Sequence, residues 1–233
     1  MSSTEVVPGV WMISQGYVGA YLIADEQLTL IDAGLAGRIR GLREAIAEAD
    51  GSRRLANIAV THHHMDHTGG LAAILAESEA IVWAHPADAK VIRGEVPAPR
   101  PPGRNPIERA AIAAMLRLGP KARKARVERE VADGEELPIA QGLIAYHTTG
   151  HTAGHLSFLM PSKRLLFVGD AAANMMGRLG PPFGLMNEDH GAIRAGIARL
   201  AQLEFDVACF GHGRVLAGDA CLAFRRLADK LGR

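Results

Sequence analysis

Apolar residues alternate along the first half of the chain between short runs and stretches with helical spacing. The short apolar runs predict strands, and they cover residues 9–14, 19–34 with a turn at 25–27, 55–60 and 80–85. Apolar residues three and four positions apart predict helices over residues 38–49, 69–77 and 86–94. The first half therefore predicts a sheet whose strands alternate with helices.

The second half repeats this alternation after an irregular insertion. Strands are predicted over residues 142–149, 155–161, 164–170 and 205–213, and helices over residues 190–203 and 219–231. Two halves of mixed strands and helices indicate an α/β protein, and we expect a single domain over residues 1–233.

The insertion around residues 95–130 differs from both halves in its amino-acid composition. It starts with a proline-rich stretch, continues with a helical pattern from Ile107, and ends in a dense charge run at residues 121–130. Long irregular segments in compact domains are often functional, so we interpret the insertion as lid-like. The charge run has no interleaved aromatic residues, and its acidic residues offset part of its positive charge. A solvated helical face is therefore favoured over a nucleic-acid arm.

Composition narrows the class of protein and its compartment. The chain has 233 residues, 48% hydrophobic residues, 22% charged residues and a formal net charge of +1, which favours neither nucleic acid nor membranes as partners. Two cysteines are too few for a disulfide scaffold, the first residues do not resemble a signal peptide, and no apolar run could span a bilayer. We expect a cytoplasmic protein with a small-molecule substrate.

The stretch AVTHHHMDHTGG, residues 59–70, holds the densest group of metal-ligating side chains. It places four histidines and an aspartate within six positions directly after a predicted strand. In an extended segment alternate side chains share a face, so His62 and His64 should point one way and His63 the other. Clustering so many unliganded imidazoles and carboxylates is costly, which favours a metal site.

Further candidate ligands follow three other predicted strands. His151 follows IAYHTTG, Asp170 follows RLLFVG and His212 follows VACFG. Imidazole and carboxylate suit zinc, and also iron or manganese. Because two cations close together repel, Asp170 is the natural carboxylate to lie between them. A metal pair can share a hydroxide that is nucleophilic at neutral pH.

These motifs resemble the metallo-β-lactamase superfamily, and the resemblance runs from LIDAG near the start of the chain to FGHG near its end. It implies a four-layer αβ/βα sandwich with two mixed β-sheets flanked by helices and the site at one edge. It also implies that seven side chains hold two divalent ions. The first ion would take His62, His64 and His151, the second would take Asp66, His67 and His212, and Asp170 would bridge them.

The resemblance favours hydrolysis over redox chemistry. His64 stands where oxygen-reducing diiron relatives carry glutamate, and Cys209 is interpreted as a core residue and not as a ligand. THHHMDHTGG is similar to the glyoxalase II signature, but we do not expect the C-terminal helical domain of that family here, because His212 lies near the end of the sequence. Lactonase relatives use a tyrosine near the bridging aspartate, and this chain has no tyrosine after Asp170.

We therefore expect a dinuclear hydrolase that attacks an ester-like carbonyl, such as a thioester or a lactone, with a metal-bridging hydroxide. Asp66 and Asp170 are the predicted catalytic residues, and Asp66 would also pass a proton to the leaving group. Zinc is the expected metal, with iron or manganese as alternatives. A phosphodiesterase or nuclease, and a non-hydrolytic metal-binding or redox protein, are the alternative functions.

Residues around the predicted site receive supporting roles. We expect Asp32 to accept a hydrogen bond from a ligand histidine. His63, His147 and His155 are predicted to be structural, and His85 to lie outside the pocket. Gly69 and Gly70 open a helix whose N–H groups could orient ligands or an anion. The apolar stretch at residues 173–186 is compatible with an acyl pocket, with core packing or with a homodimer contact.

Overall fold

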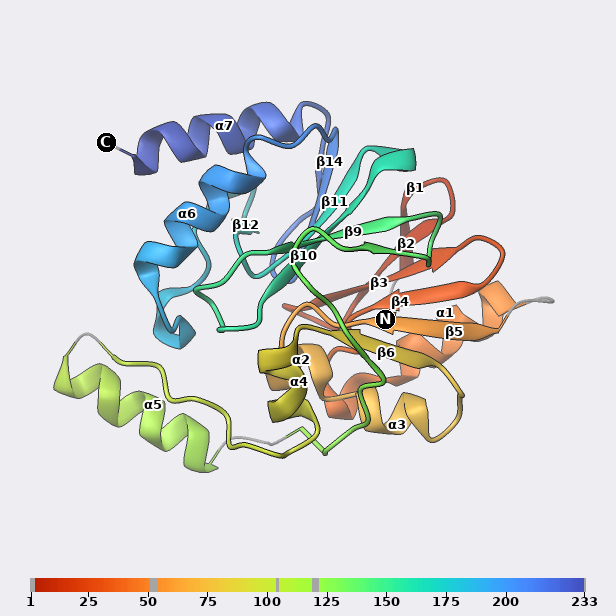
Figure 1. The fold of residues 1–233 in the computed structure, drawn as a ribbon, viewed down its shortest axis with the longest axis horizontal. Coiled ribbons are helices and arrows are strands. Elements are labelled where there is room, and N and C mark those ends of the chain that lie inside the picture. The colour runs from red at the N-terminus through yellow and green to blue at the C-terminus, as the bar shows by residue number, and fades with distance from the viewer. Residues whose placement is uncertain (1–2, 51–53, 104, 119–121, 233) are drawn as a thin grey trace.

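The computed structural model describes residues 3–50, 54–103, 105–118 and 122–232 of the chain. Its strands form two large sheets that lie face to face, with helices on the outer face of each (Figure 1). The seven-stranded sheet follows the order β1 to β7: Ser3–Val7, Val10–Ser14, Gly19–Ala24, Leu28–Ile31, Leu55–Ala59, Ile81–Ala84 and Arg129–Glu130. The predicted α/β sandwich is thereby confirmed.

The six-stranded sheet comes from the second half of the chain, in the order β15-β14-β11-β10-β9-β8. Its strands, in chain order, are β8 Glu136–Leu137, β9 Leu143–His147, β10 Leu156–Met160, β11 Leu165–Gly169, β14 Val207–Phe210 and β15 Leu216–Ala217. Strands β12 Ala173–Met175 and β13 Arg178–Gly180 pair separately as a hairpin. The apolar stretch after Asp170 therefore has regular structure of its own.

Helices cover the outer faces of both sheets and fill the connections. The α-helices are α1 Arg40–Asp50, α2 Met65–Thr68, α3 Leu71–Leu75, α4 Pro86–Ile92, α5 Pro106–Leu118, α6 His190–Leu200 and α7 Ala220–Leu231. Short 3-10 helices are η1 Ala36–Arg38, η2 Pro161–Lys163 and η3 Gly184–Met186. None of the described helices is long and apolar enough to cross a membrane.

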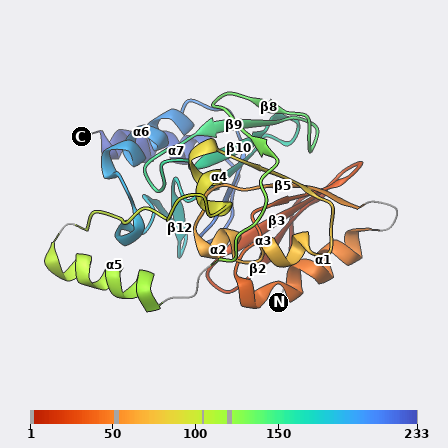
Figure 2. The same ribbon diagram turned by 60° about the horizontal axis from the view of Figure 1, so that its bottom comes forward.

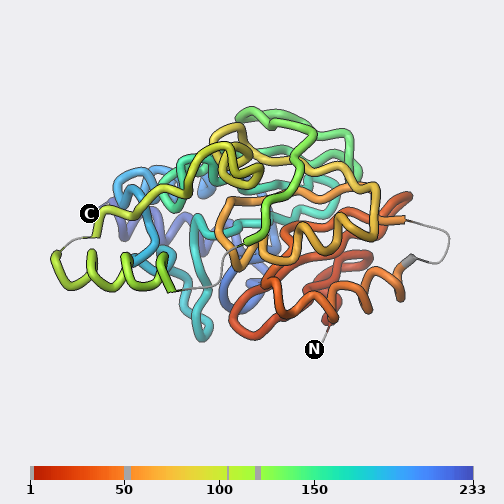
Figure 3. The backbone as a smooth tube through the Cα atoms, turned by 90° about the horizontal axis from the view of Figure 1, so that it is seen from below, coloured from red at the N-terminus to blue at the C-terminus, as the bar shows by residue number. Residues whose placement is uncertain are grey.

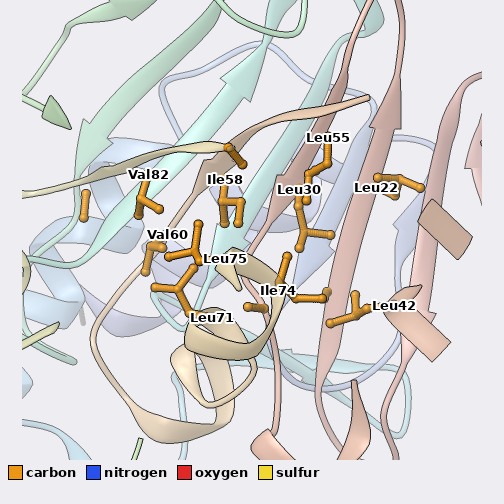
Figure 4. Packing of buried hydrophobic residues seen from close by; sticks show 14 of the residues in the cluster. Leu22, Leu30, Leu42, Leu55, Ile58, Val60, Leu71, Ile74, Leu75 and Val82 are labelled. Atoms are coloured by element: carbon orange, nitrogen blue, oxygen red, sulfur yellow. The ribbon is translucent and has the colours of Figure 1, made fainter. Parts of the chain in front are cut away.

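The molecule has four layers of secondary structure, in the order helices, sheet, sheet and helices. Three apolar layers of buried side chains lie between them. The first lies between the seven-stranded sheet and helices α1 and α3, where Leu30, Ile58 and Leu71 pack against one another (Figure 4). The second lies between the two sheets, and the third lies between the six-stranded sheet and helices α6 and α7. Successive side chains of one strand serve different layers, as strand geometry requires: Phe167 of β11 faces the other sheet, whereas Leu166 faces the helices.

The charge run at the end of the insertion is not a helix over residues 122–130, the part that the structure describes. Residues 122–128 run extended from the end of α4 to β6 and lead into β7, so the predicted helical face is wrong. The N–H of Glu128 donates to the carbonyl of Val82 at 2.9 Å, and Val127 is buried in the first apolar layer. The edge of β6 thus supplies a hydrogen-bond partner to this segment, and the segment contributes Val127 to the first apolar layer.

Helix α5 lies away from the two sheets, on the side where α6 begins (Figures 1 and 2). The backbone tube shows the same separation when the molecule is seen from below (Figure 3). The helix contacts η3, and Ile112 is its only buried residue among those described. Over the residues that the structure describes, the insertion is thus an arm that carries one helix, α5.

Candidate metal centre

The candidate ligands all lie in loops at one edge of the two sheets. In the seven-stranded sheet β5 runs parallel to β4, and in the six-stranded sheet β14 runs parallel to β11. The chain therefore leaves β11 and β14 at the same edge of their sheet. Backbone hydrogen bonds join the two sheets there: the N–H of Gly19 donates to Gly211 at 2.9 Å, and that of Leu156 donates to Thr61 at 2.8 Å. Loops from distant parts of the sequence therefore meet at one place.

All seven predicted ligands converge at this edge. Their ligand atoms form three overlapping groups whose members lie within 4.8 Å of one another: His62, His64 and His151; His62, His67 and Asp170; Asp66, His67 and His212. The shared members mean that the three groups form one continuous cluster.

Asp170 lies in the middle of the cluster. Its Oδ2 atom is 3.3 Å from His151 Nε2 and 3.1 Å from His212 Nε2, and its Oδ1 atom is 3.5 Å from His67 Nε2. Asp66 Oδ2 lies 3.4 Å from His212 Nε2 on the more exposed side. One carboxylate thus touches both ends of the cluster, as expected for a bridging ligand.

Two buried ligand atoms lack any hydrogen-bond partner in the described part of the chain. They are His67 Nε2 and Asp170 Oδ1, and both belong to the cluster. Leaving a buried polar atom unsatisfied costs about 1–3 kcal/mol. Imidazole nitrogen and carboxylate oxygen are suitable ligands for zinc, iron and manganese. The residues present therefore fit divalent metal ions.

Hydrogen bonds determine which ring nitrogen of His62 and of His67 faces the cluster. Thr61 Oγ1 donates to Asp32 Oδ2 at 2.7 Å, so its oxygen accepts from His62 Nδ1 at 3.0 Å. His67 Nδ1 also donates to Asp32 Oδ2, at 2.8 Å. The Nε2 atoms of His62 and His67 are thereby left to face the cluster. The expected hydrogen bond between Asp32 and a ligand histidine is confirmed.

Two further histidines are oriented by partners that sequence reasoning missed. His151 Nδ1 donates to the side-chain oxygen of Asn187 at 2.8 Å, and His212 Nδ1 donates to the Tyr17 carbonyl at 3.0 Å. The Tyr17 ring also stacks on His212, with centroids 5.6 Å apart, and is 61% exposed. Neither residue lies within a recognisable motif, because the loops that carry them meet the cluster only in the folded chain.

The electrostatics divide the cluster into two halves. Burial and neighbouring imidazoles lower the pKa of His62 and of His64, and burial lowers that of His151, so these rings are neutral. At the other end burial opposes the charge, but nearby carboxylates raise the pKa of His67 to about 9 and that of His212 to about 11. The same imidazolium groups hold the pKa of Asp170 well below its usual range.

The remaining histidines lie outside the three groups. His63 Nδ1 lies 3.1 Å from Asp88 Oδ2, and the His63 ring centroid is 4.9 Å from that of His64. His85 accepts a hydrogen bond from the N–H of Ala87 and stacks on His147 at 4.1 Å. His155 accepts a hydrogen bond from the backbone N–H of Asp170 at 2.8 Å, so it supports the loop of that aspartate.

Gly70 has a packing role in place of the anticipated anion contact. Its N–H donates to the carbonyl of Gly34 at 3.0 Å and is therefore engaged. A Cβ atom at Gly70 would lie 2.3 Å from the carbonyl oxygen of Ala33, and one at Gly69 would lie 2.3 Å from that of Met65. These glycines allow the ligand-bearing segment to pack closely on the loop that follows β4.

Comparison with known proteins agrees with this geometry. The model of the metallo-beta-lactamase superfamily matches residues 14–212. The probable metallo-hydrolase YflN of Bacillus subtilis is 27% identical, over 92% of this chain and 87% of that protein. A hydroxyacylglutathione hydrolase of Bartonella tribocorum is 29% identical over 68% of this chain, but the match covers only 50% of that enzyme.

The first listed curated relatives are not all matched over their full length. The match to the uncharacterized protein YobT of Bacillus subtilis, at 31% identity, covers 66% of this chain and 61% of that protein. Among solved structures, the MIM-2 metallo-beta-lactamase is 26% identical with a TM-score of 0.70, covering 96% of this chain and 84% of its own. The subclass B3 enzyme MEM-A1, from a soil metagenome library, has a TM-score of 0.72 at 21% identity over 100% of this chain and 93% of its own, and shares the fold.

Proposed function

Since the chain belongs to the metallo-beta-lactamase superfamily and is a metal-dependent hydrolase, we propose that it uses two divalent ions to hydrolyse an ester-like carbonyl. Thioesters and lactones are the proposed substrate class, and zinc is the proposed metal, with iron or manganese as alternatives. The relatives named hydroxyacylglutathione hydrolase support a small acyl substrate.

The observation that carries the proposal is the convergence of seven ligand-type side chains on one aspartate. We propose that the first ion is held by His62, His64 and His151, that the second is held by Asp66, His67 and His212, and that Asp170 bridges them. The overlapping groups of ligand atoms support this assignment. The two unsatisfied buried atoms, one on His67 and one on Asp170, support it independently.

When bound, such a pair of ions supplies a nucleophilic hydroxide at neutral pH and polarises a carbonyl oxygen. The chain itself contributes orientation and proton handling. In the metal-free protein burial opposes the ionisation of Asp66, but the hydrogen bond from His212 holds its pKa at about 2. The Asp66 side chain is 20% exposed, whereas that of Asp170 is 4% exposed. Because metal binding would remove the proton from His212, that hydrogen bond would be lost, and the more exposed Asp66 is proposed to accept a proton and pass it to the leaving group.

The insertion around residues 95–130 is proposed to act as a lid. Its helix α5 packs on η3, and Asn187 directly after η3 orients His151. Both segments carry exposed apolar side chains, namely Ile107 and Met115 on α5 and Phe183 just before η3. Such a surface suits the apolar part of an acyl substrate.

The proposal is tested by metal analysis combined with a substrate panel. Protein purified without added metal would be analysed for zinc, iron and manganese, and assayed with thioesters, lactones, β-lactams and phosphodiesters. We expect hydrolysis of at least one thioester or lactone, and loss of turnover by more than about a thousandfold in Asp170→Asn and His64→Ala. Asp206→Asn, at the other end of β14 from His212, is the matched control.

Four results would contradict the proposal. Cleavage of bis-p-nitrophenyl phosphate without cleavage of any carbonyl substrate would indicate a phosphodiesterase. Full metal loading without hydrolysis of any panel member, or oxygen consumption by a diiron centre, would indicate a non-hydrolytic protein. Retained turnover in Asp170→Asn would exclude the bridging role of Asp170.

A further inference from the structure

Asp88 is a buried carboxylate outside the proposed ligand set. It lies in the first turn of α4, and its exposed fraction is 2%. It belongs to none of the groups whose ligand atoms could share an ion. A carboxylate that is buried but not needed as a ligand requires another explanation, because burying an unpaired charge is costly.

Hydrogen bonds from two different loops explain its burial. Oδ2 accepts from the backbone N–H of His63 at 2.8 Å and from Thr152 Oγ1 at 2.8 Å, and the His63 ring nitrogen Nδ1 lies 3.1 Å from the same oxygen. Oδ1 accepts from the N–H of Gly154 at 2.9 Å. Hydrogen bonds to an ionised acceptor are roughly twice as strong as neutral ones.

These partners are the immediate neighbours of the proposed first metal site. His63 separates His62 from His64, and Thr152 directly follows His151. One side chain therefore ties together both loops that supply the three-histidine group. In the other half of the cluster, Asp32 holds His67 directly, and it also reaches His62 through Thr61. Asp88 is the carboxylate that joins the loop of His151 to that of His62 and His64.

Close packing around Asp88 also accounts for a glycine in the motif GHTAGH. A Cβ atom at Gly154 would lie 2.5 Å from Asp88 Oδ1 and 2.7 Å from the Asp88 nitrogen. Any larger residue would push the loop of His151 away from α4. The spacing between the two loops is therefore determined at the carboxylate of Asp88.

We propose that Asp88 is a positioning residue that sets the distance between His151 and the pair His62 and His64, and thereby the affinity for one of the two ions. This inference rests on the proposed function, since it assumes that the three-histidine group holds a metal. Asp88 itself touches neither metal nor substrate. Its loss should therefore weaken one site selectively and leave the other site intact.

The test compares metal affinity in Asp88→Asn with that in the parent and in the control Asp206→Asn. The protein would be stripped with a chelator, checked for folding by circular dichroism, and titrated with zinc against a chromophoric chelator. The parent and the control should bind two ions tightly. Asp88→Asn should bind one ion tightly and the second with roughly 10- to 100-fold lower affinity, in the range found for outer hydrogen-bond partners of metal ligands.

A milder pair of variants covers the case in which Asp88→Asn does not fold. Thr152→Val removes one donor to Asp88 while keeping the shape of the side chain, and Thr152→Ser restores the hydroxyl. We expect Thr152→Val to weaken one ion by a smaller factor than Asp88→Asn and Thr152→Ser to bind as the parent does. Absorption spectra of the cobalt-substituted proteins should change for one of the two ions in Thr152→Val and remain parental in Thr152→Ser.

Two outcomes would overturn the inference while leaving the proposed function in place. In the first, Asp88→Asn binds both ions with parental affinity. In the second, both ions weaken equally in Asp88→Asn and in Thr152→Val, which would mean a general structural role. A parent protein that binds no metal, by contrast, would refute the proposed function itself.

Discussion

Metal binding should release about two protons from histidines, both from one half of the site. The perturbation is the addition of zinc to chelator-treated protein. In the metal-free protein His67 and His212 lie among carboxylates, which raise the pKa of His67 to about 9 and that of His212 to about 11 although burial opposes the charge. The rings of His62, His64 and His151 have lowered pKa values and are already neutral. Metal ions bind neutral imidazole, so only His67 and His212 must lose a proton.

The expected amount follows from these pKa values. Between pH 6.5 and pH 8 both His67 and His212 stay almost fully protonated, so the release from histidines should remain near two protons for the two ions. Five histidines with the ordinary pKa of about 6.5 would behave differently, because their summed release would fall from about 2.5 protons to about 0.2 over the same range. Ionisation of water in the site adds protons toward higher pH and cannot produce such a fall.

Isothermal titration calorimetry in two buffers of different ionisation enthalpy measures the release at each pH. His212→Asn should release about one proton fewer than the parent, because it removes one of the two charged rings. A release that falls by about two protons between pH 6.5 and pH 8 would refute the division of the site into a neutral half and a charged half.

Further predictions concern the residues that support the site and the core. Asp32→Asn should weaken zinc binding by roughly 10- to 100-fold, measured by equilibrium dialysis, because it removes the acceptor that orients His67. Phe167→Ala should lower the free energy of unfolding by about 3–5 kcal/mol in urea, because the ring is buried between the sheets; a loss below about 1 kcal/mol would contradict that packing. In the metal-free protein, the folded pKa of His67, about 9, lies above the unfolded value of about 6.5, so its stabilisation is complete below pH 6.5 and is lost as the pH rises through about 9. The melting temperature of the parent should accordingly fall more over that range than that of His67→Gln, and equal falls would argue against the raised pKa.

The sequence by itself determined the strand and helix pattern and the residue types of the site. Alternating apolar runs predicted most strands because strand side chains serve two layers, as Leu166 and Phe167 do. The ligand-type residues were visible because each follows an apolar strand, where loops collect functional groups. The role of Asp32 was also predictable, since it ends a strand next to the one that leads into the histidine cluster.

Only the tertiary structure decided which residues surround those ligands. Asn187, the Tyr17 carbonyl and Asp88 contact the ligand histidines or their neighbours from segments distant in sequence, and no local periodicity encodes such contacts. The charge run at residues 121–130 also shows that local sequence does not decide the structure of a segment by itself. Over residues 122–128, the part of the run before β7 that the structure describes, its composition suits a helix, but the open edge of β6 and the burial of Val127 hold it extended. Local sequence specifies what a segment can form, whereas long-range hydrogen bonds and burial select the form that it adopts.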